Sequence, residues 1–252
     1  MRDFFSLNLS ALAVRSPALA LKLKDFTPNQ HYEVFQGSDV LNINIIDKRT
    51  NTALFQHNPL EETNAKIAEF GAYSHYPYLY FFGVGNGVLF KVLLQNELLK
   101  RIVVLEPELE LLFIVLHFMD FSKDILEQRI MFLDATSVDF TRIDILFSTN
   151  RDAKIYSKVY DLHLFNAYYN AYADLYIKIN QLFIRAIEHS VISVGNDSRD
   201  SIVGIQQHIQ NLPSVIQSPT LLDLLAQIKG RDTAIIVATG PSLSKQLPLL
   251  KQ

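Results

Sequence analysis

Cysteine is missing from all 252 residues of this chain. Its absence excludes disulfide bonds and thiolate metal sites. The seven histidines never recur four residues apart, the spacing that places two imidazoles on one face of a helix, so the sequence predicts no zinc site. A strong excess of one charge is also missing, because 23 lysines and arginines stand against 26 aspartates and glutamates. With a net charge of −3 the chain offers no strongly basic surface, which speaks against a nucleic-acid partner.

Long apolar runs are missing as well. No uninterrupted stretch reaches the ~18–20 apolar residues of a membrane-spanning helix, and the nearest, Leu109 to Met119, contains Glu110 and His117. The N-terminus carries Asp3 and no apolar run of the kind found in signal peptides. Hydrophobic residues nevertheless make up 49% of the chain and charged residues 19%, which is typical of a packed core. We therefore expect a globular protein of the cytoplasm with no membrane span.

The first part of the chain combines helices with a β-hairpin. Leucine, alanine and lysine recur at helical spacing over 9–26, with an interruption at Pro17. Two apolar runs, 40–46 and 53–55, flank a polar turn and predict a β-hairpin. Pro59 and the two glutamates that follow it predict the first turn of a helix, which we expect to end near residue 70.

The next part has the most regular pattern of the chain. The expected elements are, in order, a strand (78–82), a glycine turn (83–87), a helix (88–99), a strand (101–105) that ends at Glu106, a helix (109–121) and a strand (130–133) closed by Asp134. Strands and helices that alternate in this way predict a Rossmann-like βαβαβ unit with a parallel sheet. The fold class is therefore α/β.

After this unit the sequence predicts one more strand, over 154–160, and a long helix over 164–194 that ends at Gly195 and Asn196. Five tyrosines gather around this helix, and such a stripe is more typical of a core or interface than of a sugar platform: Tyr160, Tyr168, Tyr169, Tyr172 and Tyr176. We expect a short helix over 202–209. The predicted organisation is a Rossmann-like domain over 1–212, a linker over 213–230 and the start of a second domain over 231–252.

Gly83, Gly85 and Gly87 form the first candidate ligand site. They follow a strand and open a helix, where free backbone N–H groups and the helix dipole can bind an anion. Glu106 lies 23 residues after Gly83, near the ~20-residue spacing at which an acid meets a ribose hydroxyl. Together with Asp134, this pattern resembles the S-adenosylmethionine pocket of class I methyltransferases. The alternative is that the glycines only allow a strand to turn tightly below a helix.

The last residues predict the beginning of a second α/β domain. An apolar β-branched run over 233–239 leads into Gly240, Pro241 and Ser242. A buried parallel strand followed by a tight turn has this pattern, and open α/β sheets bind nucleotides and their sugars at such turns. Only 245–252 follow, too few residues to cover the strand on both faces. We therefore expect the chain to be the front part of a longer, truncated protein.

Several motifs occur together in an order that is typical of one family. They are 195–204, 211–213, 235–243 and 246–251, with 41–48, 58–61, 83–87 and 106–108 upstream. This succession resembles the motility-associated factor (Maf) family, bacterial proteins that glycosylate flagellin with nonulosonic acids such as pseudaminic or legionaminic acid and are needed for flagellar assembly and motility. The resemblance covers nearly the whole chain.

The resemblance implies a Rossmann-like domain before a sialyltransferase-like domain, which would transfer a nonulosonic acid from its CMP-sugar to serine or threonine of flagellin. Gly240, Pro241, Ser242 and Leu243 would form part of the nucleotide-sugar site, although Ser244 stands where the family often has aspartate. Flagellin and the CMP-sugar are the implied partners. We assign no catalytic residue, metal or cofactor to this chain, and we expect it to be inactive alone.

Two other functions stay open on the sequence. A methyltransferase that uses the Gly83–Gly87 turn would bind S-adenosylmethionine without any further domain. A non-catalytic domain that docks flagellin would bind flagellin and no small molecule.

Overall fold

The computed structural model of the chain describes residues 3–39, 41–192 and 198–230. Its residues fall into two compact units, Met1–Gly195 and Asn196–Gln252. The first unit contains both β-sheets, and the described part of the second contains two helices, α10 (Ser198–Gln217) and α11 (Leu221–Ile228). Residue 212, where the sequence analysis ended the first domain, lies inside α10.

The central sheet has four parallel strands, β4 (Tyr78–Phe82), β5 (Arg101–Glu106), β6 (Ile130–Asp134) and β7 (Leu162–Leu164). Their order across the sheet is β6-β5-β4-β7. All five side chains of β4 are buried, as expected for a central parallel strand with both faces covered. The chain order reverses between β4 and β7, so this is the switch point of the sheet. The predicted Rossmann-like unit is confirmed.

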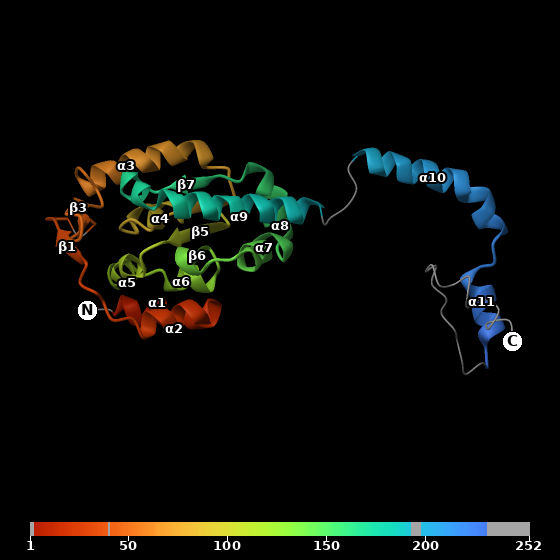
Figure 1. The fold of residues 1–252 in the computed structure, drawn as a ribbon, viewed down its shortest axis with the longest axis horizontal. Coiled ribbons are helices and arrows are strands. Elements are labelled where there is room, and N and C mark those ends of the chain that lie inside the picture. The colour runs from red at the N-terminus through yellow and green to blue at the C-terminus, as the bar shows by residue number, and fades with distance from the viewer. Residues whose placement is uncertain (1–2, 40, 193–197, 231–252) are drawn as a thin grey trace. The chain divides into compact units, whose positions relative to one another are not determined.

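Nine α-helices and four short 3₁₀ segments accompany the two sheets in the described part of the first unit. The α-helices are α1 (Phe4–Arg15), α2 (Pro17–Lys24), α3 (Pro59–Phe70), α4 (Val88–Leu93), α5 (Leu109–Phe118), α6 (Ser122–Leu126), α7 (Phe140–Ser148), α8 (Arg151–Tyr156) and α9 (Ala173–Ile192). The helix α1 contacts α2, α5 and α6, whereas α7 contacts α8 and α9 (Figure 1). Pro17 stands at the first position of α2, so the predicted interruption separates two helices.

A small antiparallel sheet lies between α2 and α3 in the chain. It contains β1 (Tyr32–Gln36), β2 (Ile43–Asp47) and β3 (Thr52–Ala53) in this order. The predicted hairpin is therefore confirmed as β2–β3, and β1 extends it by a strand that the sequence analysis did not assign. Burial alternates along β2, with Ile43 and Ile45 facing the core.

The strand predicted over 154–160 is wrong. This segment forms the end of α8 and a 3₁₀ turn over Ser157–Val159, and the fourth strand of the sheet comes later, at β7. Asn150 explains the difference, because its side chain accepts hydrogen bonds from the backbone N–H groups of Asp152 and Ala153 at 3.0 and 3.1 Å and so starts a helix.

The long helix predicted over 164–194 begins later. Leu164 ends β7, a 3₁₀ segment η4 (Ala167–Tyr172) follows, and only then does α9 begin. The Asn166 side chain starts η4 by accepting from the N–H of Tyr168 at 3.2 Å. The tighter 3₁₀ winding directs Tyr169 into the core, where it is fully buried.

The short helix predicted over 202–209 and the linker predicted over 213–230 are also corrected. The helix α10 continues through Pro213, and α11 starts at a capping box between Thr220 and Asp223. None of the apolar side chains on these two helices is buried, and Ile202 and Leu222 keep 65% and 76% of their surface. Within 198–230 and the other described residues, nothing covers the apolar side chains of these helices.

Asn8 attaches α1 to the Rossmann-like unit. Its amide donates to the carbonyls of Leu116 and Met119 at 2.9 and 2.7 Å, and its Oδ1 accepts from the N–H of Phe121 at 2.7 Å. Asn8 is fully buried. One side chain thus satisfies three backbone groups around the C-terminal end of α5, where the helix itself leaves carbonyls without partners.

Replacing this side chain tests the attachment. We expect Asn8→Ala to lower the free energy of unfolding by about 2–4 kcal/mol, because buried backbone groups lose their partners. Ser10→Ala is the matched control on the same helix, since the Ser10 hydroxyl is exposed and bonds only to the carbonyl of Ser6. Urea unfolding of the full chain measures both variants, and equal losses would contradict the assigned role of Asn8.

Candidate functional site

The glycine turn lies at the carboxyl end of β4, beside the ends of β5 and β7. Gly83, Gly85 and Gly87 have φ values of +106°, +59° and +82°. Residues other than glycine rarely adopt this backbone conformation. A Cβ atom on Gly87 would lie 2.8 Å from Val115, and one on Gly83 or Gly85 would overlap an aromatic ring, that of Tyr169 or Phe165 respectively. The three glycines are therefore required both by backbone conformation and by close packing.

The N–H groups of Val84 and Gly85 in this turn are already paired within the chain. The N–H of Val84 donates to Oε2 of Glu106 at 2.7 Å and to the hydroxyl of Tyr169 at 3.1 Å. The N–H of Gly85 donates to the same hydroxyl at 3.2 Å. Asn86 completes the turn by accepting from the N–H of Val88 and donating to the carbonyl of Ile43 in β2. The sequence analysis placed a possible anion at this turn, and here the N–H groups of Val84 and Gly85 donate to a tyrosine oxygen.

Glu106 is the centre of this network. It is buried at the end of β5, where its Oε2 accepts from the Tyr169 hydroxyl at 2.9 Å and its Oε1 accepts from the N–H of Glu108 at 2.9 Å. Burial raises the pKa of Glu106 to about 8, against the effect of the hydrogen bonds it accepts. Burial also raises the pKa of Tyr169 well above its usual value, so its hydroxyl keeps its proton.

A second, partly exposed cluster of polar side chains surrounds Arg49. Its guanidinium contacts the carboxylates of Asp47 and Glu108 at 2.9 and 3.0 Å and the Tyr32 hydroxyl at 2.7 Å. Tyr172 donates to the same Glu108 oxygen at 2.6 Å. Burial alone would raise the pKa of Asp47, but the hydrogen bonds from Arg49 hold it below its usual value. The cluster joins the small sheet to β5 and η4, and its charged groups are paired with one another.

Asp134, the second acid of the predicted pocket, has different partners. Its Oδ1 accepts from the N–H and hydroxyl of Thr136 at 2.9 and 2.6 Å, and its Oδ2 pairs with Lys22 of α2. Burial alone would raise the pKa of Asp134, and these partners lower it. The structure therefore unites the three glycines with Glu106 but gives Asp134 a capping role at the end of β6.

The remaining predicted site residues lie elsewhere. Gly240, Pro241, Ser242 and Leu243 fall outside the described residues. Within 3–39, 41–192 and 198–230, no group of three histidine, aspartate or glutamate side chains is arranged to hold a metal ion. No helix in those ranges is both long and apolar enough to cross a membrane.

The sequence analysis missed the two aromatic residues that close the turn, Phe165 and Tyr169. Tyr169 was interpreted correctly as a packing residue, but on a continuous helix and without a link to the glycines. The available signal was Asn166, because an asparagine that starts a helical turn separates β7 from α9. Its amide also donates to the carbonyl of Leu54 at 2.6 Å, a contact across 112 positions that no local pattern reveals.

The buried carboxyl group predicts a pH dependence of stability. Between pH ~4.5 and 8 the folded chain holds a proton on Glu106 that the unfolded chain releases, so the free energy of unfolding falls as the pH rises through this window. We expect Glu106→Gln to remove this contribution, whose slope is at most about 1.4 kcal/mol per pH unit. Glu97→Gln, at an exposed position, should leave the slope unchanged. Unfolding by urea at several pH values measures it, and an unaltered slope in Glu106→Gln would refute the assignment.

Comparisons with other proteins show which families parts of this chain resemble. Residues 4–76 match the family described as the glycosyltransferase Maf N-terminal domain, and residues 206–252 match the family described as 6-hydroxymethylpterin diphosphokinase MptE-like. A solved structure of the MAf glycosyltransferase from Magnetospirillum magneticum AMB-1 aligns with 76% of this chain at 12% identity and a TM-score of 0.48. The chain spans 35% of the length of that protein. The curated proteins include no match. Residues 4–76 are thus similar to the N-terminal domain of Maf glycosyltransferases.

Proposed function

We propose that this chain is the N-terminal portion of a flagellin glycosyltransferase of the cytoplasm. In the complete protein, a nonulosonic acid such as pseudaminic or legionaminic acid would pass from its CMP-sugar to a serine or threonine hydroxyl of flagellin, with release of CMP. The observation that carries the proposal is the match of residues 4–76 to the Maf N-terminal domain. The order of motifs along the chain supports the more specific sugar and acceptor.

The donor site belongs to the second domain in this proposal. The turn of Gly240, Pro241, Ser242 and Leu243 would begin it, and the family match over 206–252 supports a domain that is distinct from the Rossmann-like unit. Backbone N–H groups at such a turn suit a phosphate. Most of α10 and all of α11 lie within this match, and their exposed apolar faces fit surfaces that pack inside this second domain.

The glycine turn has a structural role in this proposal. A ligand at Val84 and Gly85 would have to displace the Tyr169 hydroxyl, which is buried and bonded to both N–H groups. It would also have to displace the Phe165 ring, which is 2% exposed. Opening this region exposes large aromatic surface and leaves the Glu106 carboxyl without its tyrosine partner. The geometry thus favours the transferase over the methyltransferase interpretation.

Deleting the coding sequence of this chain in its own bacterium tests the proposed function. We expect the intact mass of flagellin to lose the mass of its nonulosonic acid residues, and the cells to lose motility. Reintroducing the gene should restore both. Flagellin of unchanged mass in the deletion strain would refute the proposal.

The purified chain should transfer no sugar by itself. A transferase site needs several positioned donors around the departing phosphate, and loss of even one such donor typically lowers the rate by ~10²–10³. The measurement is intact mass of flagellin after incubation with CMP-pseudaminic acid, with a full-length relative as the positive control. Turnover above the blank would mean that residues 1–252 contain the catalytic groups.

Calorimetric titration with S-adenosylmethionine distinguishes the methyltransferase alternative from the proposed glycosyltransferase function. We expect no saturable heat, because the donors of the glycine turn are bonded to Tyr169 and Glu106. Saturable binding at micromolar concentration that disappears in Glu106→Gln would instead favour the methyltransferase interpretation.

A further inference from the structure

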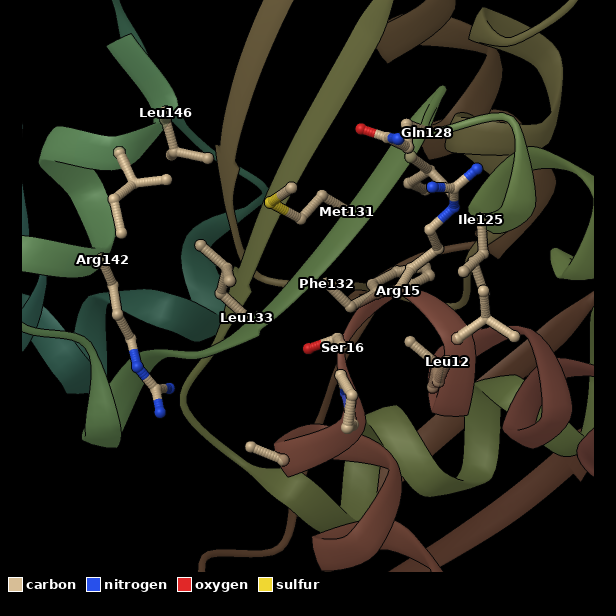
Figure 2. A pocket seen from close by; sticks show the side chains of 15 residues that line it. Leu12, Arg15, Ser16, Ile125, Gln128, Met131, Phe132, Leu133, Arg142 and Leu146 are labelled. Carbon is tan, nitrogen blue, oxygen red and sulfur yellow. The ribbon is translucent and has the colours of Figure 1, made fainter. Parts of the chain in front are cut away.

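A groove of about 410 Å³ runs along β6 (Figure 2). It is separate from the glycine turn and shares no residue with it. The strand β6 is the last of its sheet and pairs only with β5 within the described residues. One side of its backbone therefore has no neighbouring strand there. We name this feature the β6 groove.

The lining of the groove shows which part of the strand it exposes. Side chains along a strand point alternately to opposite faces of the sheet. Ile130, Met131, Phe132 and Leu133 are consecutive, yet all four line the β6 groove. A cavity over one face would touch only every second residue. The β6 groove therefore lies against the edge of the strand, where backbone N–H and C=O groups point outward.

Two helical walls border this edge. Leu12 of α1 and Ile125 of α6 line one side, and Leu146 of α7 lines the other (Figure 2). Ile145, the neighbour of Leu146 in α7, also lines the groove. Ile145 is half exposed, so apolar surface faces the groove without a partner. An extended chain between these walls would have one set of side chains against α1 and α6 and the alternate set against α7.

Within the described residues, β6 itself contains neither lysine nor proline, and the α1–α2 junction at Ser16, Pro17 and Ala18 lines the groove beside it. Natural edge strands carry lysine, proline, a bulge or a covering loop, or they are very short. The other edge strand of this sheet, β7, has only three residues, and its Leu162 carbonyl accepts a hydrogen bond from Tyr176. In contrast, β6 has four uncharged apolar residues before Asp134 and no proline. An apolar edge inside a groove is typical of a surface that receives another strand.

The charge of the groove indicates the chemistry of that strand. Arg15 and Arg142 line it, and no acidic residue does. The Arg15 guanidinium donates to the carbonyl of Leu126, whereas the Arg142 side chain forms no ion pair within the described residues. In a chain whose net charge is −3, this local positive charge favours a carboxylate in the partner.

We propose that the β6 groove binds an extended segment of a partner polypeptide, which adds to β6 as a strand, alternates apolar side chains and presents a carboxylate to Arg142. The proposal does not depend on the transfer reaction. A second copy of this chain fits less well, because edge-to-edge pairing of two β6 strands would bring two equally positive grooves together. A helix fits less well because its backbone groups are already paired internally and would leave the edge of β6 unsatisfied.

Selection of peptides tests this proposal. A displayed library of random peptides is selected on the full chain, and the selected sequences are synthesised and titrated by calorimetry. We expect sequences that alternate apolar residues and contain an acid. We expect that N-methylation of the peptide nitrogens that face β6 abolishes binding. N-methylation of the nitrogens that face away from β6 should leave binding unchanged.

A charge exchange tests the role of Arg142. We expect Arg142→Glu to weaken binding of the selected acidic peptide by about fivefold and to favour the same peptide with lysine in place of its acid. Arg151→Glu makes the same change of charge at an exposed position outside the groove and should bind like the unaltered chain. Ile145→Glu, also at an exposed position, should prevent binding without loss of folding, which circular dichroism monitors.

Three results would overturn the proposal. One is that no selected peptide binds the chain in solution. Another is that neither N-methylation of the peptide nor Arg142→Glu changes the affinity of the selected peptide. The third is that sedimentation shows a dimer of the peptide-free chain that Ile145→Glu dissociates, because the groove would then be an interface between copies.

Discussion

The hydroxyl group of Tyr169 is the contact on which the central part of this structure depends. It accepts from the N–H groups of Val84 and Gly85 and donates to Glu106. These groups come from the ends of β4 and β5 and from η4, which are far apart in the chain. In a parallel sheet the carboxyl ends of adjacent strands leave polar backbone groups that require partners. Here the Tyr169 side chain supplies part of them inside the core and bonds η4 to the ends of β4 and β5.

The arrangement of the small sheet follows from the same constraint. The segment η4 can insert Tyr169 only if its first turn is held in place, and Asn166 does this through the carbonyl of Leu54. Asn86 of the glycine turn donates to Ile43 of β2, and Arg49 connects β2 to Glu108 beyond β5. The hairpin and the Rossmann-like unit are thus bonded at several points around the closed turn. Opening it for a ligand would disturb contacts that reach back to Ile43, 43 residues before Asn86.

The elements that the sequence predicted well are those whose signals are local. The apolar strands and the glycine turn of 78–134 have unambiguous periods, and the α/β fold follows from their alternation. The helix α7 was not assigned, although Asp139 before it accepts from the N–H of Arg142 and is a recognisable cap. The errors over 154–160 and 164–194 concern short apolar and aromatic runs, whose period does not distinguish a strand from a helix.

The sequence predicted which glycines and which glutamate lie together at the candidate site, but not the hydrogen bonds that these residues form. The spacing of Gly83 and Glu106 placed them together correctly, because both follow adjacent parallel strands. No local pattern could reveal that Tyr169 would bond to the glycine turn, since its approach depends on contacts across 63 residues to Glu106 and 85 to Val84. Asp134 was grouped with them because it also ends a strand. Its ion pair with Lys22 depends on α2, which the Rossmann pattern does not include.

The distribution of unpaired backbone groups connects these observations. An open parallel sheet has two places where such groups can meet a partner: the carboxyl ends of its strands at the switch point, and its outer edges. In this chain the first place is filled by Tyr169 and Glu106, and β7 shortens one edge to three residues. The edge of β6 is then the part of the sheet that keeps both free backbone positions and apolar surface beside them. Strand addition at an outer edge is a physical means of binding a partner that does not depend on the glycine turn.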